Sequence, residues 1–207
     1  MSNITLVMKG GDKLSKKLAE IAARTGEPTH VRVGFLEDAK YTDGTSIAYI
    51  AAVNEFGGSW QMPARLATIY RKINERTGAF LRGGKFVKRK ASNFATDHAV
   101  GAYTHTQPPR PFFRNMIAAK KGEWGAQLAK VLKATRFDAD KALALMGAEI
   151  EGQLQDSIKA FVSPPNAPST IRAKGFAKPL IGGSRDSGGG GLMAQSTGYE
   201  VTSGTTE

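Results

Sequence analysis

The stretch DADKALALMGAEIEGQLQDSIKAF, residues 138–161, decides much of the fold, because its apolar residues recur every three or four positions. That period predicts a long amphipathic helix. Its apolar face would consist of Leu143, Met146, Ile150, Leu154, Ile158 and Phe161. The octapeptide THVRVGFL, residues 29–36, instead alternates apolar and polar residues and predicts a strand with Val31, Val33 and Phe35 on one face.

Other segments show the same kinds of signal. Further helices are predicted over residues 11–25, 47–55, about 114–134, 168–175 and about 192–196, and a last strand over 197–202. Thr45 or Ser46 would cap the second of these helices, and Gly57 would end it. In the helix over 11–25, the apolar face would include Leu14, Leu18 and Ile21.

Residues 59–112 are expected to be rich in β-structure. Strands are predicted over 67–73, 85–89 and 101–106, with residues 74–84 linking the first two into a long hairpin. Two strands bury little surface, so such a hairpin must be an arm or lean on a partner.

These elements predict an α+β fold in a single domain over residues 1–207, a size that suits one domain or one domain with an arm. A small, mostly antiparallel sheet would pack against two or three helices. Residues 59–107 would be a long basic β-hairpin inserted into the domain, 182–191 a flexible glycine-rich loop, and 203–207 a disordered tail.

The net charge of +11 is concentrated in the middle of the chain. Residues 58–135 contain fifteen basic and three acidic residues, whereas the flanking segments are close to neutral. This pattern fits a segment that contacts DNA or an acidic partner, and equally a solvated charged face. The candidate contacts are Arg71, Lys72, Lys85, Lys88, Arg89 and Lys90. Aromatic residues interleaved with these cations are typical of single-strand binders, although alternation along strands explains them better.

Catalytic chemistry finds little support in the sequence. Cysteine is absent and only three histidines occur, which argues against thiolate and multi-histidine metal sites. The glycine run 188–191 lacks the Gly-Lys-Ser/Thr of a phosphate-binding loop, and Ser187 beside Asp186 has no base near it in sequence. We therefore expect no enzyme activity, no catalytic or metal site and no cofactor.

Three sets of motifs, taken together, resemble one family. The first is VGFL (33–36) followed by IAYIAAVNEFG (47–57), and the second is MPAR (62–65), echoed by PPRPFFR (108–114). The third set is APSTIRAKG (167–175), KPLI (178–181) and GYEV (198–201). Their order and spacing over residues 30–202 resemble the neck or tail-completion proteins of long-tailed bacteriophages, also called virion-morphogenesis or putative tail-component proteins.

The resemblance implies a structural virion protein at the head–tail connector or tail terminus. Copies would form a homo-oligomeric ring, with six expected and twelve as the alternative, between the head–tail adaptor and the tail terminator or tail tube. Viral double-stranded DNA would pass through the lumen, and no membrane would be involved. The protein would reside in the virion, and in the host cytoplasm during assembly. The candidate subunit contacts are Asn54, Glu55, Phe56, Pro109, Arg110, Phe112, Phe113 and Arg114.

Two departures from the family pattern concern the loop and the arm. Residues 182–185 precede Asp186-Ser187-Gly188, and extra glycines follow, so the loop is longer than in the family. Residues 59–107 form an insertion that many relatives lack. The alternative interpretation is a basic nucleic-acid-binding protein that acts through this arm.

Overall fold

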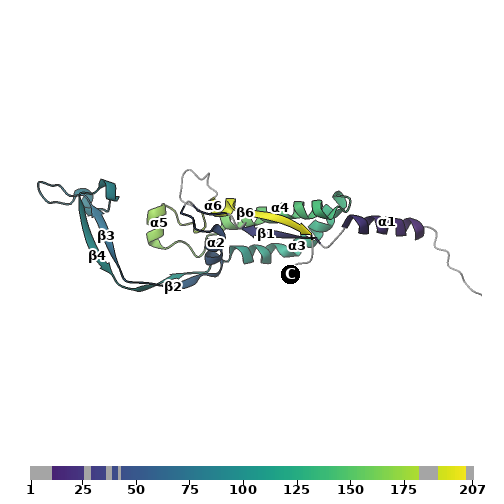
Figure 1. Cartoon of the computed structure of the whole chain (residues 1–207), viewed down its shortest axis with the longest axis horizontal. Coiled ribbons are helices and arrows are strands. Elements are labelled where there is room, and N and C mark those ends of the chain that lie inside the picture. The colour runs from purple at the N-terminus through teal and green to yellow at the C-terminus, as the bar shows by residue number, and fades with distance from the viewer. Residues whose placement is uncertain (1–10, 26–28, 36–38, 42, 182–190, 204–207) are drawn as a thin grey trace, which may run out of the picture. The chain divides into compact units, whose positions relative to one another are not determined.

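The computed structural model describes residues 11–25, 29–35, 39–41, 43–181 and 191–203. The chain divides into two compact units (Figure 1): residues 58–107, here called the arm, and the body, which consists of the segments before and after it. The body contains α1 (Gly11–Thr25), β1 (Thr29–Phe35), α2 (Ile47–Phe56), α3 (Phe112–Ala134), α4 (Ala139–Ala160), α5 (Pro168–Lys174), α6 (Gly191–Gln195) and β6 (Thr197–Ser203). The arm contains β2 (Gly58–Met62), β3 (Arg65–Arg71), β4 (Phe94–Val100) and β5 (Tyr103–Gln107), with 3₁₀ turns at Leu81–Gly84 and Arg89–Ala91.

The predicted α+β class is confirmed, although the strands form three two-stranded antiparallel sheets and not one. In the body, β1 pairs with β6 from Thr29 opposite Ser203 to Phe35 opposite Thr197. Helix α4 packs along this pair (Figure 1). The approach is close at Gly147, where an added Cβ would lie 2.5 Å from a ring carbon of Tyr199 and 2.8 Å from Val31.

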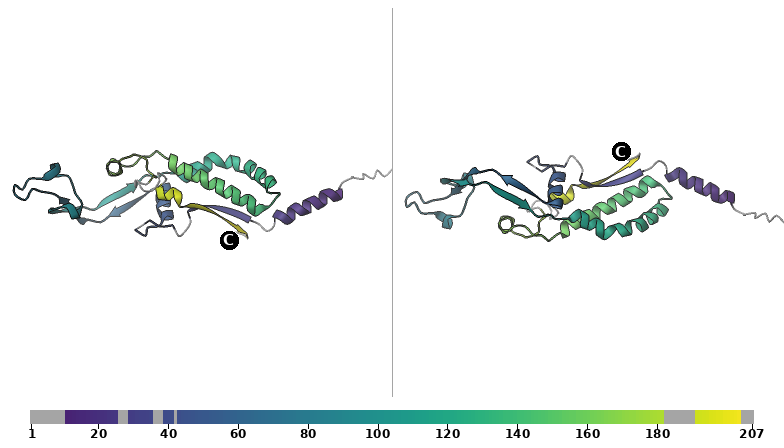
Figure 2. Two further views of the ribbon diagram at one scale, coloured as in Figure 1. Left: turned by 90° about the horizontal axis from the view of Figure 1, so that it is seen from above. Right: turned by 90° about the horizontal axis from the view of Figure 1, so that it is seen from below.

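Helices α3 and α4 lie side by side in the body (Figure 2). Trp124 on α3 donates a hydrogen bond to Gln153 on α4 at 3.0 Å. The hydroxyl of Ser157 on α4 donates to the carbonyl oxygen of Phe112 at 2.7 Å. These two bonds fix the register of the helix pair at both its middle and one end.

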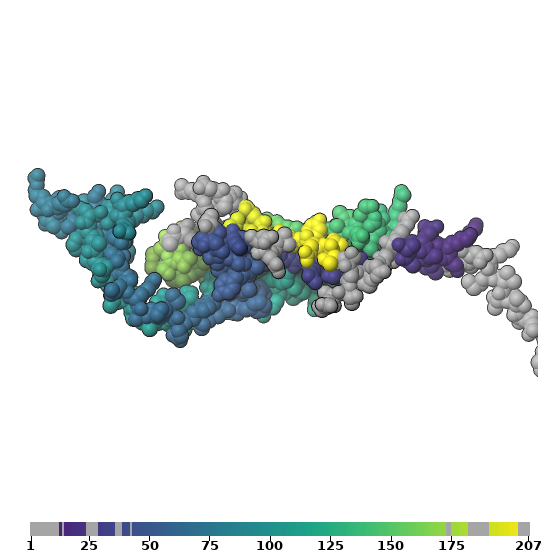
Figure 3. All heavy atoms as spheres, in the orientation of Figure 1, coloured from purple at the N-terminus to yellow at the C-terminus, as the bar shows by residue number. Residues whose placement is uncertain are grey.

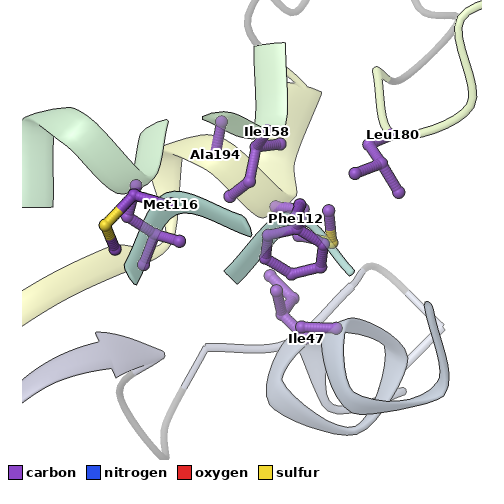
Figure 4. Packing of buried hydrophobic residues seen from close by; sticks show 9 residues of the cluster. Ile47, Phe112, Met116, Ile158, Leu180 and Ala194 are labelled. Atoms are coloured by element: carbon purple, nitrogen blue, oxygen red, sulfur yellow. The ribbon is translucent and has the colours of Figure 1, made fainter. Parts of the chain in front are cut away.

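The hydrophobic core of the body is built from segments far apart in the sequence. Ile47, Phe112, Leu154 and Ile158 are its largest fully buried side chains. Figure 4 shows Phe112 between Ile47 and Ile158, so α2, α3 and α4 meet at this ring. The ring of Phe35 on β1 meets the Phe112 ring edge to face at a centroid distance of 6.3 Å.

Most predicted body elements are confirmed within a residue or two. Ser46 caps α2 through its hydroxyl, which accepts from the backbone amide of Tyr49. Asp138 caps α4 through its carboxylate, which accepts from the backbone amide of Lys141. Helix α3 begins at Phe112, two residues before its predicted start. One detail was wrong: Ser203, expected in a disordered tail, pairs within β6.

Helix α1 matches its predicted range, but of its predicted apolar face Leu18 is exposed and Ile21 is half-buried, while the side chain of Leu14 lies outside the described part. The predicted glycine-rich loop and C-terminal tail also lie outside it, except for Gly191 and Ser203. None of the described helices is long and apolar enough to cross a membrane.

The arm is one continuous hairpin made of two ladders. Next to the body, β2 pairs with β5 from Gly58 opposite Gln107 to Met62 opposite Tyr103. Farther along, β3 pairs with β4 from Arg65 opposite Val100 to Arg71 opposite Phe94. Figure 1 shows the two strands of the arm side by side, and in the space-filling view of Figure 3 the arm is narrow along its length and wider at its tip.

The predicted strand over 85–89 is wrong. A tight turn does form after Ile73, which bridges back to Phe80, but the chain then passes through Arg82, Gly83 and Gly84 with φ of 53°, 65° and 73°. Three successive left-handed residues break an extended strand. The long partner of β3 is therefore β4, whose Thr-Asp-His centre hides its strand character in the sequence.

Candidate functional site

Glu55 joins the end of α2 to the start of α3. Pro111 precedes α3 and has no side-chain group that could accept hydrogen bonds from its first amides. The Glu55 carboxylate takes that role, accepting from the backbone amides of Phe113 at 2.9 Å and Arg114 at 3.2 Å. A negative charge is favourable at this position because the amino end of a helix carries a partial positive charge.

Arg114 completes this junction from the solvent side. Its Nε donates to Glu55 Oε1 at 2.8 Å, and its Nη2 donates to the Glu55 carbonyl oxygen at 2.9 Å. The guanidinium also lies over the ring of Phe56, 5.1 Å from the centroid. Glu55 is 5% exposed and Phe56 is 67% exposed, so the carboxylate is internal while the neighbouring ring faces solvent.

Arg110 forms a second buried connection. Its backbone amide donates to the Asn54 carbonyl oxygen at 2.6 Å, and its Nη1 donates to Asn54 Oδ1 at 2.8 Å. Its Nε and Nη2 donate to the carbonyl oxygens of Pro164 and Pro165, each at 3.4 Å. Burial lowers the pKa of the Arg110 guanidinium, which nevertheless stays charged at neutral pH.

These contacts change the meaning of the NEFG and PPRPFFR motifs. Phe112 was expected to anchor a partner but is 1% exposed and belongs to the core, so that expectation is wrong. Glu55 and Arg110 are likewise buried and bonded within the body. Asn54 and Phe113 are half-buried, which leaves Phe56, Pro109 and Arg114 as the exposed members of the predicted contact set.

The tip of the arm brings together residues that the sequence separates. The amide of Leu81 donates to the Lys72 carbonyl at 2.8 Å, and the amide of Val87 donates to the Tyr70 carbonyl at 2.9 Å. These two bonds fold residues 81–87 back onto the end of β3. Arg71 is thereby placed beside residues nine and fifteen positions later in the chain.

An arginine and two phenylalanines form the centre of the tip. The Arg71 guanidinium carbon lies 5.3 Å from the ring centroid of Phe80 and 5.3 Å from that of Phe86, within the range of cation–π attraction. The Phe80 ring also packs edge to face on Phe94 at 5.8 Å. We call Arg71, Lys72, Phe80, Lys85, Phe86 and Lys88 the tip cluster.

The charge of the arm is not compensated internally. Residues 58–107 contain nine basic and two acidic residues, a net charge of +7. The two carboxylates accept hydrogen bonds from neutral groups: Glu75 from the side-chain amide of Asn93, and Asp97 from the Thr68 hydroxyl. Every residue of the arm is described by the structure, and no salt bridge forms within it. Four of the six residues predicted to contact DNA or an acidic partner lie in the tip cluster, and the other two, Arg89 and Lys90, follow in a 3₁₀ turn.

Phe80 and Phe86 were seen in the sequence only as interleaved aromatics and not as site residues. The signal that could have grouped them is the Arg-Gly-Gly run at 82–84, whose glycines permit the reversal between the two rings.

Two of the three histidines, His98 and His105, make side-chain contacts within the arm. His98 shares a hydrogen bond with Thr96 at 2.9 Å, and His105 stacks on Trp60. Across the described ranges, no three His, Asp or Glu residues are grouped as a metal would require. Asp186 and Ser187 fall outside those ranges.

No family model matches the chain, and no curated protein or solved structure matches it.

Proposed function

We propose that this chain is a structural protein of a phage virion, located at the head–tail connector, neck or tail terminus. Copies form a ring that joins head to tail around the DNA channel and completes tail assembly. The observation that carries the proposal is the arm, a two-stranded ribbon in which Leu66, Phe80 and Phe86 remain exposed. Isolated two-stranded ribbons are marginally stable, so such an arm is suited to order against a neighbouring subunit.

The body also offers surfaces for subunit contacts. Strands β1 and β6 each pair with a single strand among the described residues, so each has an outer edge to which a neighbour could add a strand. On α2, Tyr49 and Phe56 are exposed and lie seven positions apart, on the same side of the helix. A closed ring requires two different contact faces on every copy, which these surfaces can supply.

The proposal assigns no reaction to the chain. Its neighbours would be the head–tail adaptor and the tail terminator or tail tube, and viral double-stranded DNA would occupy the lumen. The motif resemblance described above supports this setting, with six copies expected per ring and twelve as the alternative.

Native mass spectrometry and electron microscopy of the purified chain test the ring. We expect closed rings for the wild type, and smaller assemblies with an unchanged circular-dichroism spectrum for Phe56→Ala, because the Phe56 side chain is exposed in the single chain. Lys121→Ala, an exposed change on α3, is the matched control and should leave the rings intact. A wild type that stays monomeric, or particles that join heads to tails infectively without this protein, would refute the proposal.

Nucleic-acid binding through the arm is a second candidate function, favoured by the uncompensated charge of +7. It requires binding to DNA that weakens steeply as salt rises, because each phosphate contact releases counterions. A passive channel protein would bind weakly at all salt concentrations. Gel-shift titrations between 50 and 200 mM salt, a range over which several contacts change affinity by orders of magnitude, separate the two.

A further inference from the structure

The ring of Phe86 is held from one side only. Arg71 lies over it at 5.3 Å, yet Phe86 is 69% exposed. Since the guanidinium covers one face, most of the exposed surface must belong to the opposite face and the edge. The contact with Arg71 also restrains the ring, so that a flat apolar surface is presented to solvent.

Three lysines belong to the same reversal of the chain as Phe86. Lys85 precedes Phe86 directly and Lys88 follows it by two positions, and the hydrogen bond from the Leu81 amide to the Lys72 carbonyl oxygen brings the backbone of Lys72 to this reversal. All three lysines are exposed, and no salt bridge engages them within the fully described arm. An open aromatic face next to several free cations combines the two elements that bind single-stranded nucleic acid: stacking on bases and attraction of the backbone.

We propose that the tip cluster binds single-stranded nucleic acid, with an unpaired base stacked on Phe86 and neighbouring phosphates bound by the lysines. The inference deepens the second candidate function above, nucleic-acid binding through the arm, and rests on it. It does not depend on whether copies of the chain assemble into a ring. In a duplex the base faces are stacked on one another, so the phosphates of a duplex could bind the lysines but its bases could not stack on Phe86. An acidic protein would likewise be attracted by the charge without needing a planar partner for Phe86.

Fluorescence anisotropy with the full chain tests the base contact. The probes are a labelled 20-nucleotide oligo-dT, a 20-base-pair duplex, and poly-glutamate as a competitor. Phe86→Leu keeps an apolar side chain but removes the aromatic face, so it should weaken oligo-dT binding about tenfold and change duplex binding less than twofold. Phe86→Tyr keeps the face and should bind oligo-dT as the wild type does.

Tyr103→Leu is the matched control for loss of an exposed ring. Tyr103 is exposed and lies on β5 opposite Met62, in the same arm but outside the tip cluster. Its replacement should leave oligo-dT affinity unchanged. Because Phe86 is exposed, Phe86→Leu should keep the wild-type Tm, and Phe86→Trp provides a second aromatic variant with which to verify rescue.

The phosphate contacts are tested by salt dependence. For a single strand, log K against log salt changes by about 0.7 in slope for each phosphate contact. Lys85→Gln and Lys88→Gln should therefore each make the slope shallower by about that amount, whereas Lys121→Gln on α3 should not.

The outcomes distinguish this inference from the function beneath it. Equal loss of single-strand and duplex binding in Phe86→Leu, or no loss, overturns base stacking while leaving the arm a nucleic-acid binder. No binding to either nucleic acid overturns both. Displacement of oligo-dT by poly-glutamate at equal charge concentration, with no effect of Phe86→Leu, identifies an acidic protein as the partner instead.

Discussion

Glu55 caps helix α3 by accepting a hydrogen bond from the backbone amide of Phe113, 58 positions later in the chain, at 2.9 Å. The acceptor comes from the last turn of α2, where a negative charge is unfavourable for its own helix. The amino end of α3 offsets that cost. Each helix therefore depends on the other at this junction.

Removal of the Glu55 carboxylate should destabilise the body. In Glu55→Ala, the amides of Phe113 and Arg114 lose their acceptor inside the protein, and we expect a loss of about 2–4 kcal/mol in the free energy of unfolding. Urea denaturation followed by circular dichroism measures it. Glu123→Ala removes an exposed pair with Lys120 and should change stability by less than about 0.5 kcal/mol. Equal effects of the two changes would contradict the capping role.

Arg110 should not be replaceable by lysine. The guanidinium donates to Asn54, Pro164 and Pro165 at once, and an ammonium on a flexible stem cannot match that planar geometry. We expect Arg110→Lys to cost about 1–3 kcal/mol in the free energy of unfolding, measured as above. Arg172→Lys, at an exposed position on α5, is the control and should be close to neutral. A neutral Arg110→Lys would show that its charge alone matters.

Two glycines of α4 should respond in opposite directions to alanine. In Gly147→Ala the new methyl group would overlap the Tyr199 ring and Val31, so α4 must move off the sheet, at a cost of about 1–3 kcal/mol. Gly152 has no heavy atom within 4 Å of an added Cβ, so Gly152→Ala should stabilise the helix by about 0.5–1 kcal/mol. Thermal unfolding of both variants measures the contrast. A stabilising Gly147→Ala would refute the close packing of α4 on β1 and β6.

Asp43 should make stability depend on acid pH. Hydrogen bonds from Thr45 hold the pKa of the Asp43 carboxyl below its ordinary value of about 3.9. Its contribution to stability is therefore complete above about pH 4 and is lost as the pH falls through the lower pKa of the folded state. The Tm advantage of the wild type over Asp43→Asn should shrink as pH falls below about 4. A carboxyl pKa at or above 3.9 by NMR titration would contradict it.

The sequence predicted the elements whose own periodicity is strong. The three-four spacing from Leu143 to Ile158 and the alternation around Val33 gave α4 and β1 within a residue or two, because a buried stripe leaves a local pattern. Strand β4 was missed since a ribbon without a core on either face needs no apolar alternation, as Asp97 and His98 at its centre illustrate.

The candidate sites were predicted less well because they depend on distant contacts. Nothing near Glu55 in sequence shows that its carboxylate binds amides of α3, so the NEFG motif was interpreted as a contact surface. Phe112 follows the proline-rich segment 107–111, and this position suggested an exposed side chain that anchors a partner. The neighbouring sequence does not show that Ile47 and Ile158 pack around it. The cations of the arm were identified from composition, whereas their grouping with Phe80 and Phe86 depends on a chain reversal at Gly83 and Gly84.

The ladder between β2 and β5 places Gly58 directly opposite Gln107, so the polypeptide leaves for the arm and returns from it at neighbouring points. The Asn54 carbonyl and the Arg110 amide are bonded to each other just before departure and just after return. A short tight turn could therefore bridge the same gap. The arm is therefore an insertion that the body does not need for its own fold. A chain without residues 58–107 should keep the helices of the body. A different hairpin with a different charge could be inserted at the same position.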